Sequence, residues 1–178
     1  MKHREESKVE RNDFVQLLLD LKKKGSYDEV EMASEGFLIY AAGFETSSTL
    51  MTFCCYELAL NQDIQERLRN ELKSRIEEND GQLTYELLFD LKYLDMVVNE
   101  TLRKYPPIPQ VVRKSTAAYK IPGTELVIEK GTSIIVPVLA LHRDPVYYPD
   151  PEKFDPERFA PENIKKMHQY TFLPFGMF

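Results

Sequence analysis

The most informative stretch of this chain is Asn99-Glu100-Thr101-Leu102-Arg103. Glu100 and Arg103 lie three residues apart, so on a helix they share one face and form a local ion pair. A second arginine, Arg158, follows in Phe154-Asp155-Pro156-Glu157-Arg158-Phe159, within a proline-rich coil that needs an anchor to be ordered. Glu100 could accept hydrogen bonds from both guanidinium groups. Taken alone, such a pair is also typical of a solvated helix, where it contributes only about 0.2–0.5 kcal/mol.

The composition is that of a soluble globular protein of one ordinary domain. The chain has 178 residues, of which 43% are hydrophobic and 29% are charged, which is enough apolar surface for a core. The net charge of -6 argues against a nucleic-acid partner, because phosphate binding needs clustered Lys and Arg. Cys54 and Cys55 are neighbours and cannot join distant segments, so we expect a reducing compartment.

The apolar window between Glu35 and Glu57 has two interpretations. It carries one charge, Glu45, and a run of hydroxyls, Thr46-Ser47-Ser48-Thr49. A carboxylate near the middle of a bilayer costs about 2.5–3.5 kcal/mol on insertion scales. We therefore predict a buried core helix, and a single-pass membrane span over residues 36–56 is the alternative.

All eleven prolines lie at or beyond Pro106 and divide the chain into a helical first part, about residues 1–105, and a sheet-and-coil second part, about residues 106–178. Apolar spacing, caps and breakers predict the helices of the first part. They run from the caps Asn12 and Asp13 to Gly25, over about residues 27–60, from Asp63 to the turn Asn79-Asp80-Gly81, near residues 84–89, and over residues 92–104.

The second part is predicted to hold a small antiparallel sheet followed by coil. Short strands are expected over residues 111–115, 119–121, 126–128 and 133–136. From His142 to Pro161 the sequence is rich in Pro, Asp, Tyr and Phe with no usable period, so we expect coil that side chains hold in place. The predicted fold class is therefore mainly α with a small antiparallel β-sheet.

An unusual group of residues, Ala42-Gly43-Phe44-Glu45-Thr46, lies in the middle of the long predicted helix. Gly43 costs about 1 kcal/mol there relative to Ala, and it lets a flat or bulky group approach the backbone. Thr46 can bond back to a carbonyl and loosen the turn. Leu38, Ala42 and Thr46 recur every four residues in one stripe, which could line a cofactor cavity or serve a helix–helix contact at small residues.

Further short motifs follow these along the chain. In order, the set is Ala42-Gly43-Phe44-Glu45-Thr46, Glu100-Thr101-Leu102-Arg103, Arg113, His142-Arg143-Asp144-Pro145, Pro156-Glu157-Arg158-Phe159 and Phe172-Leu173-Pro174-Phe175-Gly176. This ordered set resembles the cytochrome P-450 family of heme-thiolate monooxygenases, and Arg11-Asn12-Asp13-Phe14 resembles its insect microsomal detoxification branch. The resemblance covers essentially the whole chain. It implies a partial cytochrome P-450 fold, with a long central helix, an ExxR helix and a Pro-rich meander.

The resemblance implies chemical roles for residues of the long helix and of the segment before Arg113. Glu45 and Thr46 would be the catalytic pair, bending the helix over the heme and supplying protons for the chemistry of oxygen. Leu38 would contact substrate from the same helix. Ile108 and Pro109, just before Arg113, would line the substrate pocket.

Other residues would hold the heme or the scaffold. Ala42, Gly43 and Phe175 would contact the heme, and Arg113 would bind a propionate, because a guanidinium pairs with a carboxylate through two hydrogen bonds. The implied structural lock, which does not touch substrate, comprises Glu100, Arg103 and Arg158.

The sequence departs from the family after Phe175-Gly176. The family continues through a further glycine and a basic residue to the cysteine that binds iron, whereas here Met177 and Phe178 follow. We therefore expect the chain, well under half of a family member, to be truncated before the ligand cysteine and to carry no metal ligand. Cys54 and Cys55 lie about 12 Å along the helix from Thr46 and are expected to be buried thiols. His142 is expected to be a structural hydrogen-bonding residue.

Complete family members, by this resemblance, bind heme and oxidise small apolar or xenobiotic compounds with oxygen. Their electrons come from NADPH through NADPH-cytochrome P-450 reductase, and they lie on the cytosolic face of the endoplasmic reticulum membrane. The charged stretch Met1 to Glu6 is followed by no apolar run, so we expect no signal or anchor here. We expect this chain to be an inactive fragment of such an enzyme. The alternative is a non-catalytic remnant or interaction fragment without thiolate-heme chemistry.

Overall fold

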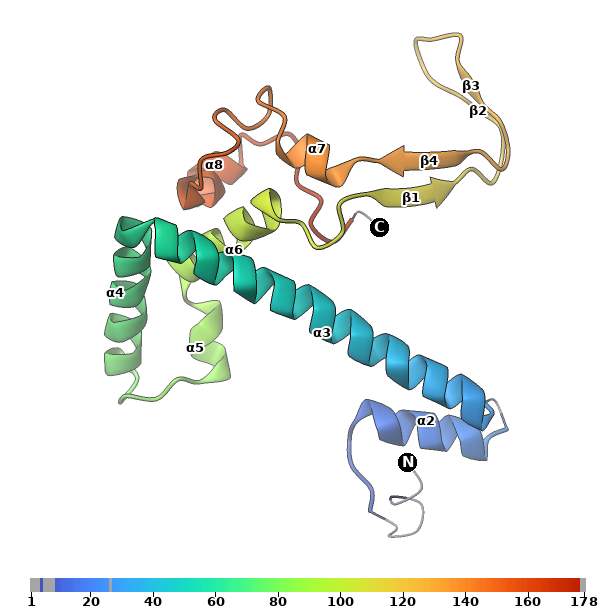
Figure 1. The fold of residues 1–178 in the computed structure, drawn as a ribbon, viewed down its shortest axis with the longest axis horizontal. Coiled ribbons are helices and arrows are strands. Elements are labelled where there is room, and N and C mark those ends of the chain that lie inside the picture. The colour runs from blue at the N-terminus through green and yellow to red at the C-terminus, as the bar shows by residue number, and fades with distance from the viewer. Residues whose placement is uncertain (1–3, 5–8, 26, 177–178) are drawn as a thin grey trace. The chain divides into compact units, whose positions relative to one another are not determined.

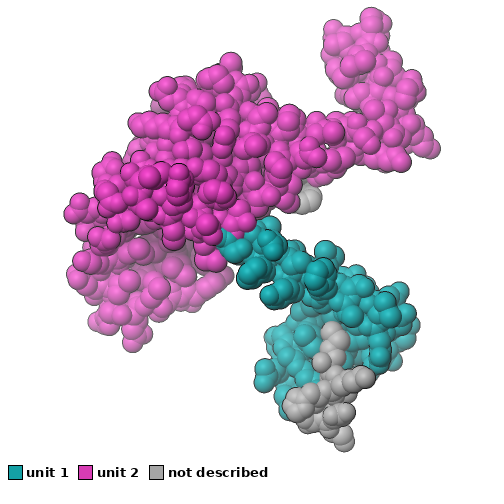
Figure 2. All heavy atoms as spheres, viewed as in Figure 1, with its two compact units in different colours: residues 1–48 teal, residues 49–178 magenta. Residues whose placement is uncertain are grey.

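The structure is a computed structural model that describes residues 4, 9–25 and 27–176. It is mainly helical with two small antiparallel sheets (Figure 1), which confirms the predicted fold class. The chain forms two compact units, residues 1–48 and residues 49–178, and each is described by itself (Figure 2). Most of the charged stretch at residues 1–6, together with Met177 and Phe178, lies outside the described residues.

Unit 1 contains α2 (Phe14–Lys23) and the first part of α3 (Glu29–Leu60). Asp13 begins α2 as its N-cap, because its carboxylate accepts a hydrogen bond from the Gln16 N–H. Gly25 follows the helix with a positive φ of 70°, a conformation that glycine adopts without strain. Leu18 and Leu19 of α2 bury their side chains against Met32 of α3. The predicted first helix and its cap are confirmed.

The long helix α3 has the predicted extent, but it is not the buried core helix that we expected. Phe37, Leu38 and Tyr40 are 71%, 61% and 66% exposed. Apolar side chains surround this helix on all sides instead of forming one stripe, and the described residues supply too few partners to cover them. As for the alternative of a membrane span, no helix within the described residues combines the length and the apolar character that crossing a bilayer requires.

Unit 2 is built around α6 (Lys92–Lys104), which packs against α4 (Gln62–Glu78) and the short 3-10 helix η1 (Pro156–Phe159). The buried core residues are Leu68, Tyr93, Met96, Val97, Phe154, Phe159 and Ala160. Between α4 and α6, Thr84 caps the short helix α5 (Tyr85–Phe89) by accepting from the Leu87 N–H. The helices predicted over this part of the chain are confirmed to within one or two residues.

The amino end of α6 is capped by a side chain from another helix. Its own N-cap residue, Leu91, makes no side-chain cap hydrogen bond. Glu71 of α4 replaces it, because its two carboxylate oxygens accept from the Tyr93 N–H at 2.9 Å and the Leu94 N–H at 3.1 Å. A carboxylate at this position satisfies free N–H groups and complements the positive end of the helix dipole. Glu71 therefore joins α4 to the helix that carries Glu100 and Arg103.

The carboxyl end of α3 is tied to the end of α6 by one buried carboxylate. Glu57 accepts from Lys104 Nζ at 2.8 Å, the Tyr105 hydroxyl at 2.5 Å and Asn61 Nδ2 at 3.2 Å. The Tyr105 ring stacks on Phe53 with centroids 4.2 Å apart. Burial, followed by the hydrogen bond to Glu57, raises the pKa of Tyr105 above its usual value. This cluster fixes the direction in which the chain leaves α6.

The strands form two separate ladders instead of the single small sheet that we predicted. In the first, β1 (Val111–Lys114) pairs antiparallel with β4 (Ser133–Val136). In the second, β2 (Tyr119–Lys120) pairs antiparallel with β3 (Val127–Ile128), so one hairpin is nested inside the other (Figure 1). The short strands β2 and β3 are joined by a turn at Gly123, whose φ is 76°. Because of this turn, β2 pairs with β3, and neither strand joins the ladder of β1 and β4.

The segment predicted as coil contains short helical turns. Immediately after β4, α7 (Val138–His142) begins, and η1 (Pro156–Phe159) and α8 (Pro161–Ile164) follow. The last two begin with a proline, whose fixed φ suits the first turn of a helix. The absence of an N–H on proline costs nothing there, because N–H groups of the first turn have no acceptor within the helix. Prolines that rule out helix interiors therefore mark helix starts in this segment, and the expectation of coil from residue 142 to residue 161 was too simple.

The interhelical cap gives a first prediction. Replacing Glu71 by Ala removes the two acceptors at the start of α6, so the free energy of unfolding should fall by about 1 kcal/mol. Glu77→Ala is the matched control, because Glu77 is an exposed glutamate on the same helix. Urea unfolding followed by circular dichroism measures both variants. Equal stabilities would show that the Glu71 cap contributes nothing.

Candidate functional site

Glu100 and Arg103 form a fully buried ion pair on one face of α6. Both side chains are 0% exposed. Arg103 Nε donates to Glu100 Oε2 at 2.6 Å, and Arg103 Nη2 donates to Glu100 Oε1 at 2.9 Å. This bidentate geometry is the strong form of the contact. The alternative that Glu100 and Arg103 form a solvated pair on the helix surface is therefore wrong.

The same two side chains bind the backbone of the irregular segment that follows the sheet. Arg103 Nη1 donates to the His142 carbonyl at 2.8 Å, and Arg103 Nη2 donates to the Pro151 carbonyl at 2.8 Å. Glu100 Oε1 accepts from the Asp155 N–H at 2.9 Å. A buried ion pair is tolerated when hydrogen bonds satisfy its remaining donors and acceptors. The pair thus orders residues 142–155 by binding their main chain.

Arg158 has a smaller part in this arrangement than we expected. Its Nε lies 3.5 Å from Glu100 Oε1 but makes no hydrogen bond. Its Nη2 donates to the Asp150 carbonyl at 2.9 Å. The prediction that Glu100 accepts hydrogen bonds from both arginines is therefore wrong, because Arg103 and the Asp155 N–H already occupy its oxygens. Arg158 acts on Glu100 through charge alone.

His142 is buried at the end of α7. Its ring Nε2 accepts from the Leu173 N–H at 2.9 Å, and its ring Nδ1 lies 3.1 Å from the Arg103 carbonyl. Because an N–H group can only donate, Nε2 carries no proton, so Nδ1–H donates to that carbonyl. Burial lowers the pKa of His142 to about 4, since the charged ring would lose its hydration. His142 is thus a hydrogen-bonding residue of the scaffold.

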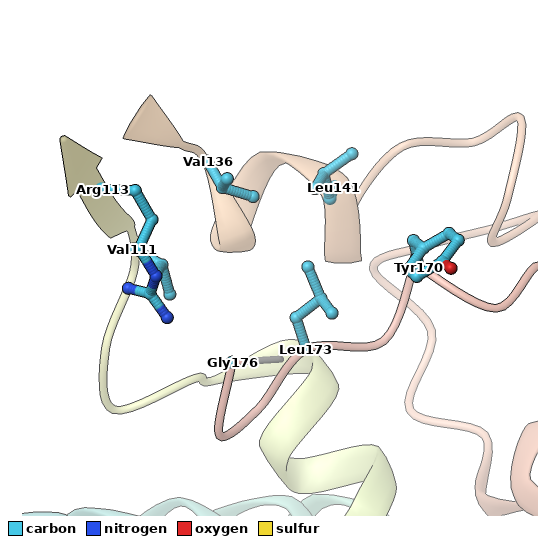
Figure 3. A pocket seen from close by; sticks show the side chains of 7 residues that line it. All are labelled: Val111, Arg113, Val136, Leu141, Tyr170, Leu173 and Gly176. Carbon is cyan, nitrogen blue, oxygen red and sulfur yellow. The ribbon is translucent and has the colours of Figure 1, made fainter. Parts of the chain in front are cut away.

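An apolar cavity of about 480 Å³ lies beside the first ladder in unit 2 (Figure 3). The residues that line it are Val111, Arg113, Val136, Leu141, Tyr170, Leu173 and Gly176. Figure 3 shows the Arg113 guanidinium directed from β1 toward the turn at Gly176. Gly176 has a φ of 77°, and a Cβ placed there would lie 4.0 Å from Arg113 Nη2. Among the described residues of the lining, Arg113 carries the one charge.

Of the residues predicted to bind the cofactor, Arg113 is in the described lining of the cavity. Phe175, one residue before Gly176, is 75% exposed and is absent from the lining. Ile108 is 54% exposed, and the Pro109 carbonyl accepts from the Leu139 N–H at 3.0 Å. Neither lines this cavity. The sequence motif that contains Leu173 and Gly176 was recognised, but only Phe175 of it was assigned to the cofactor. The lining residues Val111, Val136, Leu141 and Tyr170 were not predicted, although the period of two along β1 places Val111 on the same face as Arg113.

The predicted residues of the long helix belong to unit 1, and the residues that line the cavity belong to unit 2. Thr46 Oγ1 donates to the Ala42 carbonyl at 2.7 Å, the bond within the helix that the sequence led us to expect. Glu45 is exposed, whereas we expected a buried acid beside Thr46. A Cβ at Gly43 would meet nothing within 4 Å, so the helix offers open space there. Leu38 is exposed on the same stripe.

The two cysteines differ in environment. Cys54 is half-buried, and burial raises the pKa of its thiol. Cys55 is exposed, which contradicts the expectation that both are buried: adjacent residues on one helix point about 100° apart. Over residue 4 and residues 9–25 and 27–176, the structure assembles no group of three His, Cys, Asp or Glu side chains suited to a metal ion.

Comparison with known proteins places this chain in a family. A family model described as Cytochrome P450 matches residues 1–177. The chain is 49% identical over 177 residues to "Probable cytochrome P450 6a13" of Drosophila melanogaster, covering 98% of this chain and 36% of that protein. It is 50% identical over 185 residues to "Cytochrome P450 6a2" of Drosophila melanogaster, covering 97% and 37% respectively. Over 196 residues it is 43% identical to "Cytochrome P450 6k1" of Blattella germanica, with coverage of 97% and 37%.

The structure is that of a mainly helical protein with a buried acid–arginine pair on α6 and an apolar cavity lined by Arg113. The chain belongs to the cytochrome P450 family. The resemblance drawn from the motifs, including that to insect members, is thereby confirmed. The chain spans about a third of the length of the curated relatives it matches.

The different geometry of the two arginines gives a second prediction. Arg103→Leu leaves Glu100 buried without its bidentate partner, so the free energy of unfolding should fall by about 3–5 kcal/mol. Arg158→Leu removes one charged hydrogen bond and should cost about 1.5 kcal/mol. Urea unfolding measures the free energy of unfolding of both variants. If Arg103→Leu is already unfolded without urea, that result agrees with the larger predicted loss. Equal losses would contradict the unequal roles of the two arginines.

The neutral state of His142 gives a third prediction. The pKa of His142 falls from its usual 6.5 to about 4 on folding, so its contribution to stability is complete above pH 6.5 and is lost as the pH falls toward 4. From pH 7 to pH 5 the loss is about 2 kcal/mol. His142→Gln does not titrate there, so the stability of wild type relative to this variant should decrease by that amount. A difference that stays constant with pH would refute the assignment.

Proposed function

We propose that this chain provides part of the heme site of a monooxygenase that oxidises small apolar compounds. Membership of the cytochrome P450 family supports the reaction class, and the cavity beside Arg113 supports the site. That cavity is the single observation on which the proposal depends. The proposal includes electron supply from NADPH through NADPH-cytochrome P-450 reductase and a location on the cytosolic face of the endoplasmic reticulum membrane. Both are taken from the family.

The lining of the cavity fits heme. A heme has a flat apolar ring and two carboxylates, and the cavity has apolar walls and one guanidinium. Arg113 can bind a carboxylate through two hydrogen bonds, and its side chain is directed into the cavity without an ion pair to a carboxylate of the described residues. Among the described residues, its guanidinium donates one hydrogen bond, to the Val112 carbonyl at 3.1 Å. Arg113 thus has donors left for a propionate.

The stripe on α3 has the properties that the proposed role requires. A bound heme would supply the activation of oxygen, and the protein would supply binding, orientation and protons. Thr46 carries a hydroxyl that already donates within the helix, and Glu45 is an acid one residue away. Gly43 leaves open space that a flat group could enter, and Ala42 beside it is small and exposed. We assign the catalytic role to Glu45 and Thr46 on this basis.

The remaining predicted residues are given roles of contact and support. Leu38, Ile108 and Pro109 are proposed to contact the apolar substrate, and their apolar side chains are exposed, as a lining for such a ligand requires. Phe175 is proposed to contact the heme. In this proposal, Glu100, Arg103 and Arg158 hold the scaffold and touch neither substrate nor heme, consistent with the burial of the first two.

Binding of hemin by the chain tests the role of Arg113. Absorbance titration should show that Arg113→Ala weakens hemin binding by about tenfold or more, because a charged hydrogen-bonded pair contributes about 1.5–3 kcal/mol. Lys114→Ala is the matched control: it removes the same charge from the next residue of β1, whose side chain points to the opposite face. Lys114→Ala should bind hemin as wild type does.

Hemin dimethyl ester sharpens this test, because it keeps the ring and the iron but lacks the two carboxylates. The difference between wild type and Arg113→Ala should vanish with the ester. If Arg113→Ala and Lys114→Ala bind hemin equally, or if the difference persists with the ester, Arg113 does not bind a propionate. The proposed cavity would then be the wrong site for heme.

A further inference from the structure

His142 connects two regions that lie far apart in the sequence. On one side, its ring Nδ1–H donates to the Arg103 carbonyl, and Arg103 Nη1 donates back to the His142 carbonyl. On the other side, its ring Nε2 accepts from the Leu173 N–H at 2.9 Å. The ring is fully buried and stacks on Phe172 with centroids 5.4 Å apart. One side chain therefore joins the buried ion pair of α6 to residues 172–173.

Leu173 and its neighbours form one wall of the cavity. Leu173 and Gly176 line it, and Leu141, the residue before His142, lines it from α7 (Figure 3). Within this segment, the Gly176 N–H donates to the Leu173 carbonyl at 3.1 Å, so the position of Gly176 follows that of Leu173. The hydrogen bond between His142 and Leu173 thus reaches the cavity wall that ends at Gly176, toward which Arg113 is directed.

A second anchor holds the same segment two residues earlier. The Tyr148 hydroxyl donates to the Thr171 carbonyl at 3.1 Å. Thr171 does not line the cavity. The two anchors are therefore similar in kind, since each is one hydrogen bond from a buried ring to the backbone of this segment. Only the His142 anchor ends on a residue of the wall.

We propose that His142 is a positioning residue, which fixes the cavity wall at residues 173–176 relative to α6 so that the cavity keeps the shape that a flat apolar ligand requires. This inference rests on the proposed function, because it takes the ligand to be heme. His142 does not touch the ligand in this proposal. It acts through the main chain of Leu173 and through the turn at Gly176, which has a positive φ.

The electrostatic surroundings of His142 favour the neutral ring that this role requires. The Arg103 guanidinium on α6 acts on the ring through its charge, and the Tyr148 ring lies against it edge to face. Glu100 is paired with Arg103. No carboxylate lies against the ring in the described part of the chain. A proton on Nε2 would place two N–H donors face to face at Leu173.

Substitutions at His142 can separate its two hydrogen bonds. Gln reaches the position of Nε2 with an acceptor, Asn reaches the position of Nδ1 with a donor, and Phe keeps only the ring. We expect His142→Gln to bind hemin within about threefold of wild type. His142→Asn and His142→Phe should bind it about tenfold more weakly. Tyr148→Phe is the matched control, because it also keeps a ring and removes one bond to the same segment, and it should stay within about threefold.

Amide hydrogen exchange without any ligand gives an independent measurement. The Leu173 N–H should exchange about tenfold or more faster in His142→Asn than in His142→Gln, while the amides of α6 exchange alike in the two variants. This comparison does not depend on hemin. It therefore still tests the Leu173 anchor if Arg113 proves not to bind a propionate, and the two failures can be told apart.

The two measurements have clear outcomes. Selective loss of hemin affinity and of Leu173 protection in His142→Asn, with recovery in His142→Gln, supports the positioning role. If hemin affinity instead follows global stability equally in the His142 and Tyr148 variants, His142 is a structural residue only. Equal exchange of the Leu173 N–H in His142→Asn and His142→Gln would overturn the proposed anchor directly.

Discussion

The buried pair of Glu100 and Arg103 is the constraint on which unit 2 depends. Removing two charges from water costs several kcal/mol per ion, and their attraction repays this only when the other donors and acceptors are satisfied. Here the partners are the carbonyls of His142 and Pro151 and the N–H of Asp155. The pair needs the irregular segment as much as the segment needs the pair. This mutual dependence explains how a proline-rich stretch with little regular structure keeps a defined path.

Local signals explain which parts of this fold could be predicted from the sequence. The N-cap at Asp13, the spacing of Glu100 and Arg103 and the prolines after α6 all act within a few residues, so the pattern of side chains shows them directly. Glu71 could not be found in this way, because it caps a helix about twenty residues further along. The same limit applies to Arg103: its partners are main-chain carbonyls, which no residue type identifies in advance.

The candidate site also combines residues that local patterns predict with residues that only long-range contacts bring together. The spacing along β1 places Val111 and Arg113 on one face, and that much could be read from the strand. Leu141 and Leu173 come from α7 and from the segment after α8, and no local pattern shows that these parts of the chain meet β1. The exposure of α3 was missed for another reason. An apolar stretch shows that a helix needs partners, whereas its burial depends on partners that the rest of the chain must supply.

The short helix α7 contacts both the buried ion pair and the cavity. Its last two residues make different contacts: Leu141 lines the cavity, and His142 hydrogen-bonds to the main chain of Arg103 and Leu173. Consecutive residues of a helix point about 100° apart, so a five-residue helix can present one residue to each region. A shift of α7 would therefore disturb the buried pair and the cavity together. The ion pair of α6 consequently sets the position of the cavity wall while remaining out of contact with whatever the cavity binds.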